Sequence, residues 1–142
     1  QYNIYQQMSQ NVYKLKENNG FINEKENDPL TLLHDIPDTD GSTWKAEKVY
    51  SASENTGSGN VHTSDGYAGA IYRNSLTNEV IVVNAGTEPG IPDIANDAQM
   101  ALGNVPLQYS SARQMMQDAI ALSGGNTSKI SVGGHSLGGS LA

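Results

Sequence analysis

The chain has 142 residues, with eight Lys and Arg against fifteen Asp and Glu, so its formal net charge is −7 at pH 7. An acidic chain lacks the basic surface that phosphate binding needs. Its charge therefore argues against nucleic acid as a partner and against charge-driven docking on anionic lipid. The absence of cysteine excludes a disulfide framework and thiolate chemistry.

The length suits one modest domain with a hydrophobic core. No internal repeat or low-complexity linker divides the sequence, so we expect a single domain over residues 1–142. No run of about 18 apolar residues is present to span a bilayer. The sequence begins with Gln1 and shows no signal peptide, which favours a mature secreted chain over a cytoplasmic one.

A helix is predicted over residues 1–19. Its apolar residues recur at spacings of four, four and three, which places them on one stripe that packs against a core: Ile4, Met8, Val12 and Leu15. Asn18-Asn19-Gly20 is a typical stop signal.

Residues 23–43 are polar and rich in turn formers. Within them, Asp38-Thr39-Asp40-Gly41 resembles part of a calcium loop, but the place of the bidentate glutamate is taken by Val49. An Asp-Gly turn is therefore preferred to a metal site.

The remaining elements follow from composition and periodicity. Strands are predicted over 44–51, 67–73, 79–84 and 129–133, helices over 92–102 and 107–122, and a loop over 53–66. The run Val80–Val83 has no polar alternation, which is typical of a strand buried on both faces. Strands alternating with helices predict an α/β sheet with parallel strands at its centre.

The last strand leads into a glycine-framed serine. Gly134-His135-Ser136-Leu137-Gly138 fits G-x-S-x-G, the nucleophile elbow of serine hydrolases. Glycine on both sides lets the chain pass close to a sharp strand-to-helix turn, and the N–H of Leu137 would then point toward a developing oxyanion. Neither a Walker loop nor a dinucleotide fingerprint fits these glycines. We expect Ser136 to be a nucleophile.

The stretch from Gly133 to Ala142 resembles the elbow of the class 3 lipases, the fungal-lipase-like branch of the α/β-hydrolases. The resemblance covers about residues 67–142. Residues 80–87 are similar to the strand and loop whose Ser or Thr supplies an oxyanion donor, which here would be Thr87. Residues 91–97 are similar to the stretch that follows. The resemblance implies the N-terminal part of an α/β-hydrolase central sheet with flanking helices. Residues 1–66 carry no motif of this family, and their pattern predicts a helix followed by a loop-rich lead-in.

The activity implied by this resemblance is that of a serine carboxylic-ester hydrolase. It would act on lipid acyl esters, as a triacylglycerol lipase or a phospholipase A1, through an acyl-enzyme on Ser136. Thr87 and the backbone N–H of Leu137 would form the oxyanion hole. No cofactor or metal is implied.

A general base and its carboxylate are still needed. In α/β-hydrolases they follow the serine in the order Asp or Glu, then His, and the six residues after Ser136 include neither. His135 points away from its neighbour at such a turn, and His34 and His62 precede the serine. We therefore expect the C-terminal half of the fold, with Asp and His, to lie in a further segment of the protein, whether continuous or a separate chain.

A further expectation concerns the edge of the sheet. Without later strands, the strand over 129–133 would be an exposed apolar edge. The alternative function is a non-catalytic fragment of a hydrolase fold that serves as a binding or interaction module.

Overall fold

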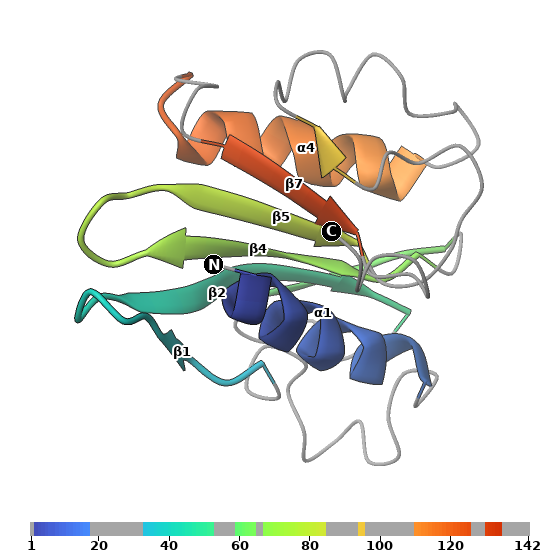
Figure 1. Ribbon diagram of the computed structural model, residues 1–142. Coiled ribbons are helices and arrows are strands. Elements are labelled where there is room, and N and C mark those ends of the chain that lie inside the picture. The colour runs from blue at the N-terminus through green and yellow to red at the C-terminus, as the bar shows by residue number, and fades with distance from the viewer. Residues whose placement is uncertain are drawn as a thin grey trace.

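The computed structural model describes residues 2–17, 33–52, 59–64, 67–84, 94–95, 110–125 and 130–134 (Figure 1). These residues form a small α/β domain in which helices pack on a curled sheet. In chain order the elements are α1 (Tyr2–Glu17), β1 (Ile36–Pro37), β2 (Thr43–Ser51), β3 (Asn60–His62), β4 (Gly69–Asn74), β5 (Val80–Asn84), β6 (Ile94–Ala95), α4 (Ser110–Leu122) and β7 (Ile130–Gly134).

The sheet is mixed, and most of its pairs are antiparallel. Its order is β1-β2-β4-β5-β7-β6, with β3 beside β2. The expected parallel pair is present at β5 and β7, where the connection contains helix α4. The expectation of parallel strands at the centre of the sheet is therefore met by β5 and β7 alone. Their neighbours β4 and β2 are antiparallel, and among the described strands β2–β3 is the second parallel pair.

Strand β5 has a helix on each side of it, as Figure 1 shows. Ile81 and Val83 belong to the hydrophobic cluster that α1 covers, whereas Val80 and Val82 belong to the cluster that α4 covers. All five residues of β5 are buried. The prediction of a strand buried on both faces is confirmed, and it explains the unbroken β-branched run.

Strand β2 changes the face that its even-numbered residues occupy. Trp44 and Ala46 pack in the α1 cluster, but the register shifts between Ala46 and Lys48, so that Glu47 is an extra residue. Beyond this β-bulge, Val49 faces α1 and Tyr50 faces α4. A bulge of one residue reverses the alternation, because side chains in a strand repeat every two residues.

Both long helices form where periodicity predicts them. Ile4, Met8, Val12 and Leu15 are all buried on α1, at no more than 5% exposure. Helix α4 buries a comparable stripe and ends before Gly124 and Gly125, both at positive φ. Glycine is suited to this ending because it adopts the left-handed conformation without strain.

The turn between β1 and β2 has the expected Asp-Gly form. Gly41 has φ +88° and donates to the Asp38 carbonyl at 3.2 Å. The Asp40 carboxylate accepts the Ser42 backbone N–H at 2.9 Å. The Asp40 side chain and the Asp38 carbonyl thus close the turn, which accounts for the resemblance of this stretch to a calcium loop.

Three expectations about local structure are corrected. The predicted loop over 53–66 contains strand β3, and the predicted helix over 92–102 contains strand β6 at Ile94–Ala95. Strand β6 pairs with Val132 and Gly133 of β7. The last strand is therefore covered by a neighbour at these positions, where we expected a bare edge.

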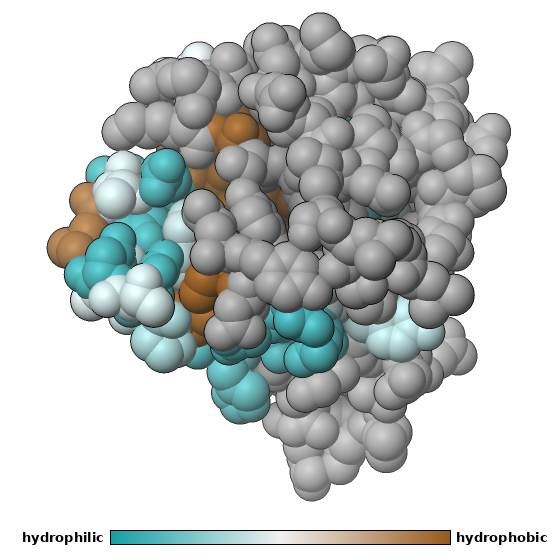
Figure 2. Space-filling view, in the orientation of Figure 1, coloured by the Kyte–Doolittle hydropathy of each residue, from teal (hydrophilic) through white to brown (hydrophobic). Residues whose placement is uncertain are grey.

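Few large hydrophobic side chains are exposed among the described residues. The two exposed ones, Tyr13 and Leu76, belong to α1 and to the β4–β5 turn. Figure 2 shows that the coloured residues on this face are largely hydrophilic, with small hydrophobic areas between them. Single exposed hydrophobic side chains are normal and do not by themselves mark an interaction surface. Among the described helices, none has the length and apolar character to cross a membrane.

Candidate functional site

The parallel strands β5 and β7 end side by side. Their register pairs Val80 with Ile130 and continues without a break to Asn84 and Gly134, the last residue of each strand. In open α/β sheets, ligands bind beyond the carboxyl ends of parallel strands. The edge of the sheet at Asn84 and Gly134 is therefore the candidate site.

The expected reactive residues follow these two strand ends in the sequence. Thr87 comes three positions after Asn84, and Ser136 and Leu137 come two and three positions after Gly134. All three, and His135, lie outside the described residues. The structure brings together the strands that lead into them.

One row of residues crosses the sheet at this edge. Val61 is paired with Tyr50, Tyr50 with Gly69, Gly69 with Asn84, and Asn84 with Gly134. We call these five residues the edge row. It places the carboxyl ends of β2, β3, β5 and β7 on the same side of the sheet.

The strand order shows how far the two upstream histidines lie from β7. His62 follows Val61 at the end of β3, and His34 precedes β1; both strands flank β2 on the side away from β7. Either strand is four neighbours from β7, which corresponds to about 19 Å at roughly 4.8 Å per neighbour. A general base needs hydrogen-bond reach of its nucleophile. Neither histidine is placed to serve a nucleophile that follows Gly134.

A buried polar pair lies at the end of β5 and includes its last residue, Asn84. The Tyr67 phenol donates a hydrogen bond to the Asn84 side-chain oxygen, and the two residues are 1% and 6% exposed. The phenol oxygen also lies 3.8 Å from the Met115 sulfur on α4. Sequence reasoning missed this pair. Its one signal was a polar residue ending the apolar run Val80–Val83.

Backbone contacts hold Tyr67 in place. The Thr63 hydroxyl donates to the Tyr67 carbonyl at 2.8 Å, and the Thr63 N–H donates to the Ser51 carbonyl at 2.8 Å. Gly69 leaves the space that the tyrosine ring occupies, because a Cβ there would lie 2.8 Å from the Tyr67 oxygen and 2.9 Å from the Met115 sulfur. Thr63 thus holds the backbone of Tyr67, while the ring lies against Gly69 of β4 and Met115 of α4.

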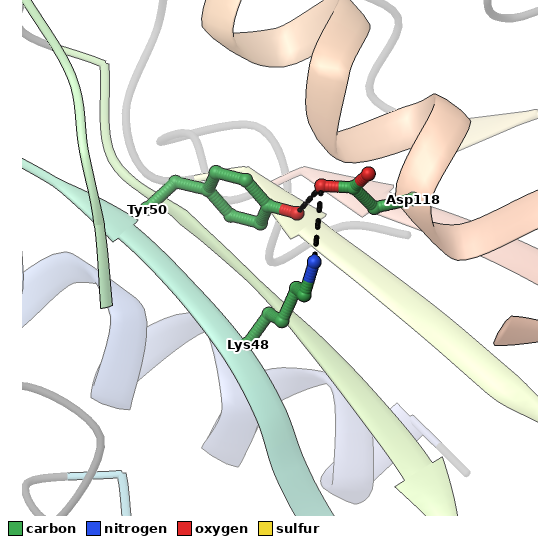
Figure 3. A network of polar contacts seen from close by, with 3 residues as sticks. All are labelled: Lys48, Tyr50 and Asp118. Carbon is green, nitrogen blue, oxygen red and sulfur yellow. Dashed lines mark hydrogen bonds and ion pairs between the residues drawn. The ribbon is translucent and has the colours of Figure 1, made fainter. Parts of the chain in front are cut away.

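A second polar group lies on the same face of the sheet (Figure 3). Tyr50 donates to Asp118 on α4 at 2.5 Å, and the Lys48 ammonium lies 3.5 Å from the same carboxylate oxygen. Burial, then the hydrogen bond and charge of Asp118, raise the pKa of Tyr50 well above its usual value of 10.0. Tyr50 therefore stays protonated at neutral pH and joins β2 to α4 as a hydrogen-bond donor.

Metal chemistry has no support within the described ranges. No three His, Cys, Asp or Glu side chains there gather closely enough to hold an ion. The polar side chains that contact Tyr67 and Asn84 at the end of β5 are amide, phenol and hydroxyl groups, which suit hydrogen bonding, and the carboxylate near Tyr50 is paired with Lys48.

Comparison with known proteins identifies the family. A phospholipase-like family model, the Tle-like phospholipase domain, matches residues 5–142. No curated protein and no solved structure matches at a significant level. The match supports hydrolysis of lipid esters as the general activity, in keeping with a site at the ends of β5 and β7. The chain belongs to the Tle-like phospholipase domain family.

Proposed function

We propose that this chain carries the nucleophile and the oxyanion hole of a serine carboxylic-ester hydrolase with an α/β-hydrolase sheet of the class 3 lipase type. Ser136 is the nucleophile, and Thr87 and the N–H of Leu137 hold the oxyanion. The substrate is a lipid acyl ester, as for a phospholipase A1 or a triacylglycerol lipase. The observation that carries the proposal is the pairing of Asn84 with Gly134, which starts both reactive segments at one edge of the sheet.

The reaction proceeds through an acyl-enzyme. A general base takes the proton of the Ser136 hydroxyl as its oxygen attacks the ester carbonyl, and the negative charge that forms on the carbonyl oxygen is held by the two N–H groups. The tetrahedral intermediate collapses and breaks the ester C–O bond, and the alcohol leaves with the proton. Water, activated by the same base, then releases the fatty acid.

The base and its carboxylate are proposed to come from a segment that follows the nucleophile. The α/β-hydrolase order requires this, and the distance across the sheet supports it, because His34 and His62 lie four strands from β7. The segment completes the site either as part of the same polypeptide or as an associated chain.

The second candidate is a non-catalytic module that keeps the sheet and binds a partner. It is favoured only by the absence of a triad histidine near β7 among the described residues. It predicts a structured domain in which Ser136 is no more reactive than other serines.

The test uses the full-length protein with a fluorophosphonate probe and a panel of p-nitrophenyl acyl esters and phospholipids. We expect covalent labelling and hydrolysis that are both lost in Ser136→Ala. Ser140→Ala is the matched control, because it removes another hydroxyl of the same stretch, and it should retain both. Labelling that survives in Ser136→Ala, or its absence from the wild type, would contradict the proposal.

The oxyanion role of Thr87 has its own test. Removal of one oxyanion donor typically lowers the rate by about 10²–10³-fold. If the hydroxyl contributes, Thr87→Ala should lower kcat within this range and Thr87→Ser should retain most of it. Equal activity of the two variants would leave only the backbone N–H as a donor.

A further inference from the structure

We propose that Asn84, held by the Tyr67 phenol, is a positioning residue for the segment that leaves β5 toward Thr87. The inference rests on the proposed function, and it assigns to a buried polar pair the task of aiming the oxyanion donor. Neither residue touches the reacting atoms in this proposal.

The position of Asn84 is the first reason. It is the last residue of β5, its backbone is paired with Gly134, and its side chain lies on the α4 face with Val80 and Val82. The segment that leads to Thr87 starts from this residue. A side chain fixed on one face restricts the orientation of this residue.

The chemistry of the pair is the second reason. An apolar residue would continue the Val80–Val83 run and would need no partner, whereas a buried amide is costly unless it is hydrogen-bonded. Replacing both members of such a pair by apolar groups of similar shape can be nearly neutral for stability. An apolar pair could therefore supply similar stability, but it could not fix the orientation of the Asn84 side chain as a hydrogen bond does.

The rigidity of Tyr67 is the third reason. Its carbonyl is held by Thr63, and its ring fills the space beside Gly69 against Met115. A donor whose backbone and ring are both held by their neighbours can hold the amide in one place. In a low-dielectric surrounding, such a hydrogen bond is also stronger than in water.

The expected defect is kinetic. Oxyanion contacts act mainly in the transition state, so their misplacement lowers kcat and leaves KM nearly unchanged. We expect Tyr67→Phe, which removes one oxygen and keeps the ring, to lower kcat by about 10- to 100-fold, as small misplacements of a catalytic group do.

Tyr72→Phe is the matched control. Tyr72 is a buried tyrosine of β4 on the opposite face, where its hydroxyl accepts a hydrogen bond from Asn11 at 3.4 Å. It should lower the melting temperature without changing kcat by more than about twofold, because it lies away from the strand end that carries the site.

The double variant Tyr67→Phe/Asn84→Leu separates positioning from stability. It removes the hydrogen bond but leaves no unpaired buried amide, so its melting temperature should recover toward that of the wild type while kcat stays low. If the pair served stability alone, both the melting temperature and kcat of the double variant would recover.

The experiment measures kcat, KM and melting temperature of the full-length protein with a short p-nitrophenyl ester, normalised by fluorophosphonate titration of active sites. A kcat of Tyr67→Phe within about twofold of the wild type, or recovery of kcat in the double variant, would overturn the inference. Wild-type protein without Ser136-dependent hydrolysis would overturn the proposed function, and this inference with it. The two failures are distinguished by the wild type alone.

Discussion

Tyr50 reaches Asp118 on α4 because Glu47 is an extra residue in β2. Before the bulge, even-numbered side chains of β2 face α1; after it, they face α4. The hydrogen bond between Tyr50 and Asp118 joins positions 68 apart in the chain. One inserted residue thus decides which side chains in the second half of β2 face α1 and which face α4.

Deletion of Glu47 should disrupt the domain. Without the bulge, either Trp44 or Tyr50 has to leave its face, and each is fully buried or nearly so. We expect a loss of more than about 4 kcal/mol in the free energy of unfolding, comparable to the total stability of a small domain. Urea unfolding followed by circular dichroism measures it. Glu47→Ala is the control and should cost less than about 0.5 kcal/mol, since the side chain is exposed.

Tyr50→Phe should cost more than removal of the lysine beside it. The variant loses a hydrogen bond to a charged group, for which about 1.5–3 kcal/mol is typical. Lys48→Met should cost less than about 1 kcal/mol, because Lys48 is 41% exposed and water screens the ion pair. A loss in Lys48→Met as large as that in Tyr50→Phe, measured by urea unfolding, would contradict this ranking of the two contacts.

Alkaline pH should weaken the fold through Tyr72. Burial, opposed by the Asn11 hydrogen bond and assisted by the charge of Asp35, raises the pKa of Tyr72 to about 12. The unfolded chain releases this proton near pH 10 and the folded chain near 12, so the contribution is complete below pH 10 and lost as pH rises to 12. The rise of the Tyr72 pKa from 10.0 to about 12 corresponds to about 2–3 kcal/mol in the free energy of unfolding. Urea unfolding at pH 9 and pH 11 should show a smaller fall for Tyr72→Phe than for the wild type.

Gly69→Ala should destabilise the domain by overpacking. The added Cβ would lie within 3 Å of the Tyr67 ring and the Met115 sulfur, and such insertions typically cost about 1–3 kcal/mol. A shorter side chain at Met115 should relieve part of the loss. A cycle with Met115→Val, followed by urea unfolding, measures the coupling; additive losses would mean that Met115 is not the neighbour that has to move.

Regular elements could be predicted because their burial repeats within the element. The stripe Ile4, Met8, Val12 and Leu15 specifies one face of α1, and Val80–Val83 specifies a strand between two helices. Neither pattern depends on knowing the partner. The same reasoning correctly placed strands β4, β5 and β7 and helix α4.

Short strands could not be predicted, because they exist only through their partners. Asn60–His62 becomes a strand by pairing with Val49–Ser51, and Ile94–Ala95 by pairing with β7. Two or three residues show no period of their own. The bulge at Glu47 was hidden for the same reason, since it is defined by the register with β4.

The candidate site also combines residues that the sequence names with contacts that depend on strand pairing. A local motif names Ser136 and Leu137, and a resemblance names Thr87; all three remain predictions. The contact between Tyr67 and Asn84 joins residues 17 positions apart and depends on the hairpin register. The pairing of Asn84 with Gly134 depends on a crossover that periodicity does not fix.

The β5–β7 pairing also has a consequence for the order in which the domain folds. It joins Val80 to Ile130 and Asn84 to Gly134, each 50 positions apart, whereas the β4–β5 hairpin closes between Arg73 and Val80. Closing the longer loop costs more chain entropy, and parallel pairing of distant strands is slow. The β2–β4–β5 meander can therefore form before β7 docks. Most of the sheet can thus be in place before β7, the strand that leads into the proposed nucleophile Ser136, pairs with β5.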